Sequence, residues 1–190
     1  MTTWNLTLFT FIHAWSGRSV FADVAAIFFA EYLPYLLVVG FLILVFRQSG
    51  ARKKFYLFAE GAVTVILARG IITESIKYFY NVQRPFAALG FSPLIGESGA
   101  SFPSGHMAWF FALVVVVWYV SRTWGIWYLA LTAAMGIARI YAGIHWPLDI
   151  LGGIVVGVVS GFFIHWLFRD ARAALSPVKE AAAGGALEAI

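Results

Sequence analysis

The chain has 190 residues and is 62% hydrophobic and 18% aromatic, whereas only 12% of its residues are charged. A soluble domain normally carries a charged share of about 25%, so the composition argues against a soluble domain and favours a polytopic membrane protein. The net charge of +4 comes without any cysteine, which excludes a disulfide framework and a thiolate metal site. Met1–Ser16 has neither a basic start nor a small-residue cleavage site, so we expect the membrane helices themselves to direct insertion.

The first expected helix is Thr3–Trp15, in which tryptophans and other apolar side chains alternate with Thr, Asn and His. It is shorter than the roughly 20 residues that a helix needs to cross a bilayer. Its tryptophans are typical of the membrane–water interface, so we interpret it as a short interfacial helix. A packed helix with no special role is an equally open alternative, and His13 is expected to be structural.

Longer apolar stretches follow, and most of them approach or exceed the length of a bilayer span. They run over Phe21–Phe46, Phe55–Tyr80, His106–Val120, Trp124–Tyr141 and Leu148–Phe168. With the N-terminal helix they predict an all-α fold, a polytopic membrane helix bundle of five to six helices. We expect one membrane-embedded domain over residues 1–170 and a flexible cytoplasmic tail over 171–190, which is rich in Ala and Gly.

Basic residues lie mainly on one side of this topology. They are Arg47, Arg52, Lys53, Lys54, Arg122, Arg169, Arg172 and Lys179. By the positive-inside rule that side is the cytoplasm, and the C-terminus is then cytoplasmic. The opposite side holds Arg18, Lys77, Arg84 and Arg139. Any site built from these cations is expected to face the periplasm or the cell exterior.

The stretch Ser101–His106 marks the point where the longest loop, 81–102, turns into a membrane helix. Pro103 and Gly105 interrupt the preceding pattern, and Ser104 is a favourable helix N-cap. The start of a helix offers unpaired N–H groups and the positive end of its dipole, both of which suit a phosphate. His106 lies in the first turn, where an imidazole can move a proton near neutral pH.

Two further polar clusters fall on the same side of the membrane. Together they contain Lys77, Arg84, Arg139, His145 and Asp149. Arginine supplies a planar donor fork and lysine a compact charge, and both match phosphate oxygens. The convergence of cations and imidazoles therefore predicts a site for an anionic phosphate group.

Each of these residues also has an alternative interpretation. Lys77 and Arg84 lie at a helix end and could extend to the interface as anchors. Arg139 precedes a turn and could cap carbonyl groups, and His145 with Asp149 could form a structural pair. The common order and side of the three clusters favour a functional site over these separate explanations.

The combined spacing resembles a known tripartite signature. The first motif is Lys77 followed, after six residues, by Arg84-Pro85. The second is Pro103-Ser104-Gly105-His106. In the third, five residues separate Arg139 from His145 and three separate His145 from Asp149. This pattern is similar to that of the type 2 phosphatidic acid phosphatase superfamily, which also contains vanadium haloperoxidases. Size and the segment His145–Gly153 resemble the small bacterial undecaprenyl-diphosphatases of that group. One departure is Ala138, where the family often has Ser; the change removes a phosphate hydrogen bond worth about 1.5–3 kcal/mol if it is charge-assisted.

The resemblance implies roles for the site residues. His145 is the expected nucleophile, which attacks phosphorus and forms a phosphohistidine, and Asp149 binds the distal N–H of its ring. His106 is the expected general acid, which protonates the leaving oxygen and then activates water. The phosphate oxygens are expected to be held by Lys77, Arg84, Ser104, Gly105 and Arg139. No metal and no other cofactor is expected.

The function that this resemblance implies is an integral-membrane lipid phosphatase of the bacterial plasma membrane, which converts undecaprenyl diphosphate to undecaprenyl phosphate. Its partners are then the bilayer and an isoprenoid or glycerophospholipid phosphate substrate, with no nucleic acid. Phosphatidylglycerophosphate or phosphatidic acid phosphatase activity is the alternative within the family. An ion or solute transporter is a further alternative, against which the one-sided charge cluster argues.

Ionisable groups inside the spans are costly unless they are paired or functional. From their comparable depth we expect Glu31 and Arg69 to pair across helices, and Glu74 to orient Lys77 from the preceding turn. The glycines at 152, 153, 157 and 161 are expected to allow close helix packing.

Overall fold

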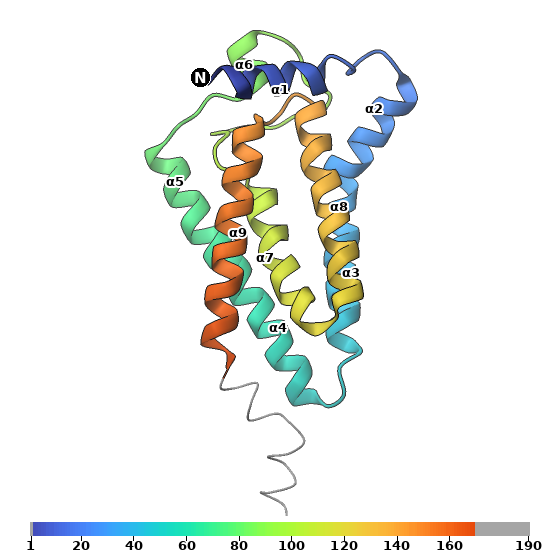
Figure 1. The fold of residues 1–190 in the computed structure, drawn as a ribbon, viewed down its shortest axis with the longest axis vertical. Coiled ribbons are helices and arrows are strands. Elements are labelled where there is room, and N and C mark those ends of the chain that lie inside the picture. The colour runs from blue at the N-terminus through green and yellow to red at the C-terminus, as the bar shows by residue number, and fades with distance from the viewer. Residues whose placement is uncertain (1, 170–190) are drawn as a thin grey trace, which may run out of the picture.

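Residues 2–169 are described in the computed structural model of the chain, and every regular element among them is helical (Figure 1). The predicted all-α class is confirmed for this part of the chain. The predicted tail, 171–190, lies outside the described residues.

The helices follow one another with short connections except for the loop before α7. In chain order they are α1 (Thr3–His13), α2 (Val20–Ile27), the π-helical η1 (Phe28–Tyr32), α3 (Leu33–Phe46), α4 (Ala51–Val65), the π-helical η2 (Ile66–Thr73), α5 (Glu74–Phe79), α6 (Pro85–Leu89), α7 (Gly105–Val120), α8 (Arg122–Tyr141) and α9 (Pro147–Leu167). Each π-helical stretch continues the helices on both sides of it. The short α6 was not predicted, because five residues in a loop carry no helical periodicity.

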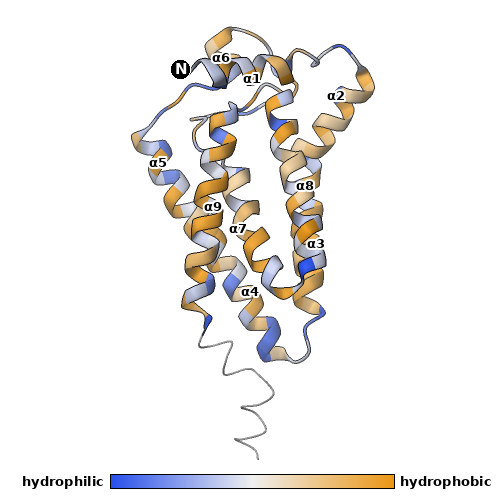
Figure 2. Cartoon of the chain, viewed as in Figure 1, coloured by the Kyte–Doolittle hydropathy of each residue, from blue (hydrophilic) through white to orange (hydrophobic). Residues whose placement is uncertain are grey.

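Within residues 2–169 three continuous helices are long and apolar enough to cross a bilayer: Val20–Phe46, Ala51–Phe79 and Pro147–Leu167. Figure 2 shows hydrophobic residues along the long helices and hydrophilic residues mostly near their ends. Helix α7 has 16 residues, which corresponds to roughly 24 Å. In Figure 1 it begins below the level at which α8 ends and α9 begins, and its first turn lies inside the bundle.

Helix α7 forms the centre of the bundle. Its residues are apolar on all sides, and most positions from Gly105 to Val117 are buried, as expected for an interior helix. Helix α9 packs on it more extensively than any other helix in the described chain. A Cβ atom on Gly153 would lie 2.5 Å from the Ser104 carbonyl oxygen, and one on Gly157 would lie 2.6 Å from the Ala108 carbonyl oxygen. The expectation that these glycines permit close packing is confirmed.

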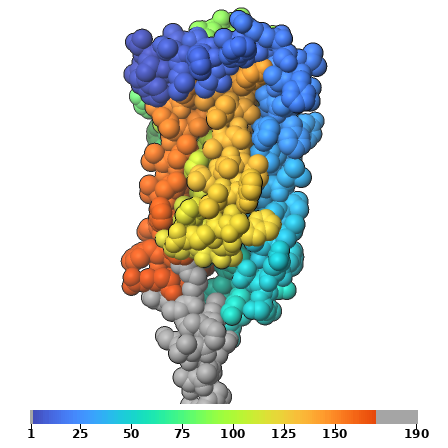
Figure 3. Space-filling model, turned by 45° about the vertical axis from the view of Figure 1, so that its right-hand side comes forward, coloured from blue at the N-terminus to red at the C-terminus, as the bar shows by residue number. Residues whose placement is uncertain are grey.

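Helix α1 lies across one end of the bundle and covers the α8–α9 connection (Figures 1 and 3). Phe9 is buried and packs against Trp146, with 4.8 Å between the ring centroids. The Asn5 side chain accepts a hydrogen bond from the Leu148 N–H at 2.9 Å. His13 Nδ1 lies 2.8 Å from a backbone carbonyl of α8, so its structural role is confirmed. The helix therefore packs through this face, while Trp4 and, just beyond the helix, Trp15 remain exposed. Its location at the membrane interface stays a prediction.

The end of the bundle opposite α1 carries the basic residues that the sequence groups on one side. Those within the described range are Arg47, Arg52, Lys53, Lys54, Arg122 and Arg169, at the ends of α3 and α9 and in the first turns of α4 and α8. Arg172 and Lys179 lie outside that range. The molecule therefore has a basic end and, at the other end, the site described next.

Candidate active site

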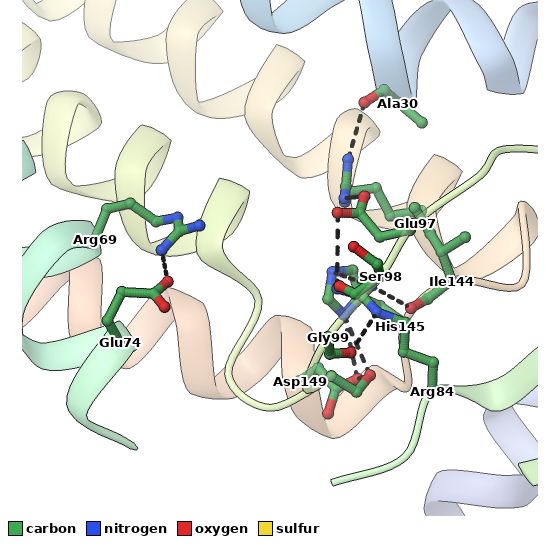
Figure 4. Close-up of polar contacts among 12 residues, drawn as sticks. Ala30, Arg69, Glu74, Arg84, Glu97, Ser98, Gly99, Ile144, His145 and Asp149 are labelled. Atoms are coloured by element: carbon green, nitrogen blue, oxygen red, sulfur yellow. Dashed lines mark hydrogen bonds and ion pairs between the residues drawn. The ribbon is translucent and has the colours of Figure 1, made fainter. Parts of the chain in front are cut away.

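The sequence clusters meet at the end of the bundle that α1 covers, and Figure 4 shows Arg84 of the first cluster beside His145 and Asp149 of the third. Arg84 precedes α6, and its Nη1 donates to the Ile144 carbonyl at 3.0 Å and lies 3.5 Å from His145 Nε2. The Ser104 N–H donates to the Asp149 carbonyl at 2.9 Å, which joins the start of α7 to the start of α9. Segments far apart in the chain thus share one site.

His145 and Asp149 are held by the start of α9. Trp146 is the N-cap and Pro147 occupies the first turn, where its missing N–H costs nothing. The Asp149 carboxylate accepts from the Trp146 N–H at 2.8 Å and from the Ser101 hydroxyl, and His145 Nδ1 lies 3.3 Å from the same oxygen. An ionised carboxylate only accepts hydrogen bonds, so this geometry assigns the proton to Nδ1 and leaves a lone pair on Nε2.

The His145 ring is held in its neutral form. Burial lowers its pKa well below the usual value, and the neighbouring charges of Arg139 and Arg84 lower it further. Both effects disfavour the imidazolium ion. A neutral ring whose Nδ1 is bound to a carboxylate presents Nε2 as a nucleophile beside a fixed guanidinium.

Arg84 is buried rather than extended to the interface, so the anchor interpretation does not describe it. Its Nε and Nη2 donate to the carbonyls of Gly99 and Ser98, both at 3.0 Å. Burial lowers its pKa from the ordinary value, and Glu97 and Asp149 oppose that effect. The guanidinium therefore organises the loop before α7 and also contributes positive charge next to His145.

Arg139 lies near the end of α8 and is also buried. Its Nη1 donates to the Ala30 carbonyl at 3.0 Å, so the predicted capping role is present, although the carbonyl belongs to another helix. Its Nη2 donates to Glu97 Oε2 at 2.6 Å. Its Nε has no hydrogen-bond partner among the described residues, and neither does the buried Ser104 hydroxyl. Both groups can donate a hydrogen bond to an anion that enters the site.

Glu97 was not predicted as a site residue. Its Oε1 lies 3.7 Å from Arg84 Nη2, so one carboxylate lies between the two arginines. It is the only acidic residue in the loop 81–102, and this is the one feature of the sequence that could have marked it as a site residue. Ser101 was also missed, since nothing in the sequence distinguishes its hydroxyl from those of other serines.

His106 and Lys77 line two cavities that adjoin Glu97. His106 faces a cavity of about 320 Å³ that Arg139 and Glu97 also line. Lys77 faces a cavity of about 710 Å³ that Arg84 and Glu97 also line. The cationic side chains act electrostatically on His106 from several sides. His106 and Lys77 thus line two cavities that share Glu97, while Gly105 supplies the first helical N–H of α7.

The expected pairing of Glu31 with Arg69 is wrong. Arg69 Nη1 pairs with Glu74, and Glu31 lies beside the cavity that Arg139 lines. Glu74 therefore binds Arg69, not Lys77. The reason is the π-helical stretch η2, in which residues five apart face one another; the Thr73 hydroxyl likewise bonds the Ala68 carbonyl.

Among residues 2–169 no group of three or more His, Asp or Glu side chains is arranged to hold a metal ion. The charges that surround the site are instead guanidinium, ammonium and carboxylate groups. The expectation of metal-independent activity stays a prediction.

Comparison with known proteins decides the family. A family model described as the PAP2 superfamily matches residues 59–173, which is more than half of the chain. The chain belongs to the PAP2 superfamily. The predicted resemblance and the predicted class of enzyme, a membrane phosphatase, are thereby confirmed.

Proteins similar to this chain carry several names. The undecaprenyl-diphosphatase BcrC of Bacillus subtilis is 33% identical over 87% of this chain and 84% of its own. The bacitracin transport permease protein BcrC of Bacillus licheniformis is 31% identical over 85% of this chain and 79% of its own. Phosphatidylglycerophosphatase B of Bacillus subtilis is 28% identical over 70% of each chain. The crystal structure of Aquifex aeolicus LpxE superposes with a TM-score of 0.70 at 27% identity, over 86% of this chain and 95% of that one.

Proposed function

We propose that the protein hydrolyses undecaprenyl diphosphate to undecaprenyl phosphate and inorganic phosphate. The observation that carries this proposal is the placement of His145, whose Nδ1 lies 3.3 Å from Asp149 and whose Nε2 lies 3.5 Å from the buried Arg84 guanidinium. The similarity to an undecaprenyl-diphosphatase over most of both chains supports the choice of substrate. The apolar helices provide a surface for the isoprenoid tail within the bilayer.

The reaction proceeds in two displacements. His145 Nε2 attacks the terminal phosphorus, the bond from that phosphorus to the bridging oxygen breaks, and the bridging oxygen leaves with the lipid phosphate. His106 gives a proton to that oxygen and then takes one from a water molecule, which attacks the phosphohistidine and releases inorganic phosphate. Asp149 keeps the Nδ1 proton in place and stabilises the positive charge that develops on the ring.

The transferred phosphoryl group is held by cations and hydrogen-bond donors. Lys77, Arg84 and Arg139 supply the positive charge, while the Ser104 hydroxyl and the Gly105 N–H complete the set. Positioning and charge stabilisation provide most of the catalysis in phosphoryl transfer, so activity is expected without a metal ion. The unpaired Ser104 hydroxyl and Arg139 Nε fit this role because the phosphate oxygens would satisfy both.

Phosphatidylglycerophosphate is the second candidate substrate, because a phosphatidylglycerophosphatase is also among the relatives. Phosphate release by the purified protein from undecaprenyl diphosphate, phosphatidylglycerophosphate and phosphatidic acid separates the candidates. We expect the highest kcat/KM on the diphosphate and loss of activity in His145→Ala and His106→Ala. A preference for either glycerophospholipid would overturn the proposed substrate. Solute flux retained by His145→Ala in proteoliposomes would instead support a transporter.

We further propose that the site faces the cell exterior or the periplasm and that the basic end faces the cytoplasm. The chain has no cysteine, so single cysteines can report on sidedness directly. A cysteine at Leu89, near the site, should react with an impermeant maleimide in intact cells. A cysteine at Gln48, at the basic end, should react only after the membrane is permeabilised; the reverse pattern would contradict this orientation.

A further inference from the structure

A cation outside the tripartite signature lies against the start of α7. A Cβ atom added to Gly105 would meet the guanidinium end of the Arg69 side chain, with Cδ and Cζ both at 2.9 Å. Arg69 thus approaches the backbone that begins the proposed phosphate-binding turn. The absence of a side chain at Gly105 is what allows this approach.

Arg69 also shares a cavity with two of the proposed phosphate ligands. The cavity of about 710 Å³ is lined by Arg69 together with Lys77, Arg84 and Glu97. Lys77 and His106 both lie within electrostatic reach of the Arg69 charge. Arg69 therefore faces the same cavity as Lys77 and Arg84 and lies within electrostatic reach of His106.

The local backbone explains the position of Arg69. It belongs to η2, a π-helical stretch within a longer membrane helix, and such stretches frequently occur at functional sites. Its Nη1 is paired with Glu74, and 35% of its side chain remains exposed. The guanidinium has five N–H donors, so this single pairing leaves others for a ligand in the cavity.

A lipid diphosphate has a second phosphate that needs such a ligand. In the proposed reaction His106 protonates the bridging oxygen, so the lipid-side phosphorus, which is bonded to that oxygen, also lies close to His106. The bridging oxygen takes the electron pair of the broken bond, and negative charge therefore develops on the departing lipid phosphate. The Arg69 guanidinium, which lies against Gly105 and within electrostatic reach of His106, is positioned to stabilise that charge.

We propose that Arg69 binds the lipid-side phosphate of a lipid diphosphate and thereby makes the enzyme prefer diphosphates to monophosphates. This inference rests on the proposed function, because it requires His145 to attack the terminal phosphate. The opposing interpretation is that Arg69 and Glu74 form an ion pair that only stabilises the helix. The two interpretations differ in what the removal of Glu74 does.

The test compares farnesyl diphosphate with farnesyl monophosphate, which share one tail and differ by one phosphate. Arg69→Gln should lower kcat/KM on the diphosphate by about 10- to 100-fold, the loss of one charge-assisted interaction. The same variant should change kcat/KM on the monophosphate by less than about threefold. Glu74→Gln, which removes the partner and keeps the cation, should retain the diphosphate preference.

Arg69→Lys is a second variant for the case that Arg69→Gln does not fold, because lysine keeps the charge and loses only the planar guanidinium. It should show an intermediate loss confined to the diphosphate. Equal losses on both substrates in the Arg69 and Glu74 variants would overturn the inference in favour of a structural pair. An unchanged substrate ratio in Arg69→Gln would overturn it while the proposed function stands. Wild-type protein that releases phosphate only from monophosphates would overturn both.

Discussion

Gly153→Ala tests whether the packing of α9 on α7 sets the geometry of the site. A Cβ atom at this position would lie 2.5 Å from the Ser104 carbonyl oxygen and 2.6 Å from Met107 Cβ. Neither atom belongs to the far end of a flexible side chain, so the two helices must move apart. Ser104 begins the proposed phosphate-binding turn, and its N–H is bonded to the Asp149 carbonyl at 2.9 Å. The substitution should therefore displace the α7 turn from His145.

The expected magnitude follows from two opposing terms. Overpacking of this kind lowers the free energy of unfolding by roughly 1–3 kcal/mol. Replacing a helical glycine by alanine raises it by about 1 kcal/mol. The net destabilisation is then up to about 2 kcal/mol. A displacement of about 1 Å at a reacting centre can lower the rate by roughly 100-fold, so the loss of activity should exceed what the loss of stability explains.

The assay is phosphate release from undecaprenyl diphosphate at a temperature where the folded fraction is unchanged, together with thermal unfolding in detergent. Gly40→Ala is the matched control, because nothing lies within 4 Å of a Cβ atom there. The control should keep full activity and an equal or slightly higher Tm. Wild-type activity and Tm in Gly153→Ala would refute the reasoning.

Three further predictions follow from the site. Asp149→Asn should lower kcat by roughly 100- to 10,000-fold with little change in KM, because the ring loses its fixed tautomer; a change in KM alone, measured by steady-state kinetics, would contradict this. The lowered pKa of His145 means that the unfolded chain binds a proton near pH 6.5 that the folded chain does not. The contribution of His145 to the free energy of unfolding should therefore be complete above that pH, and below it the free energy of unfolding should fall by up to about 1.4 kcal/mol per pH unit. In thermal unfolding between pH 7.5 and pH 5, His145→Gln should lose less stability than the wild type. Activity should survive EDTA, and complete loss that added metal restores would argue against the proposed chemistry.

The positions of the long helices were predictable because each is an apolar run of helical length, although only three of them qualify as bilayer spans within the described residues. The run Trp124–Tyr141 corresponds to α8, Arg122–Tyr141, and Leu148–Phe168 corresponds to α9, Pro147–Leu167. The π-helical stretches were not predictable, because a shift of backbone hydrogen bonds by one residue leaves no mark in composition. The mistaken partner for Arg69 follows directly from that, since an α-helical register does not place it opposite Glu74.

The cations and imidazoles of the site were predictable because their spacing in the chain is characteristic. Glu97 was not, because its position depends on how the loop folds onto Arg84 and Arg139. Ser101 reaches Asp149 only through the same loop. Side chains that a loop brings into a site by tertiary contacts have no periodicity that a sequence could reveal.

The most direct test of the central proposal is to trap the covalent intermediate. His106→Ala should slow its hydrolysis, because His106 activates the water that attacks it. Incubation of this variant with a lipid diphosphate labelled in the terminal phosphate, an alkaline quench and mass spectrometry should locate the phosphate on His145. The label should be absent when His145→Ala is combined with it. Phosphate release without any phosphohistidine, or a label on another residue, would contradict the account.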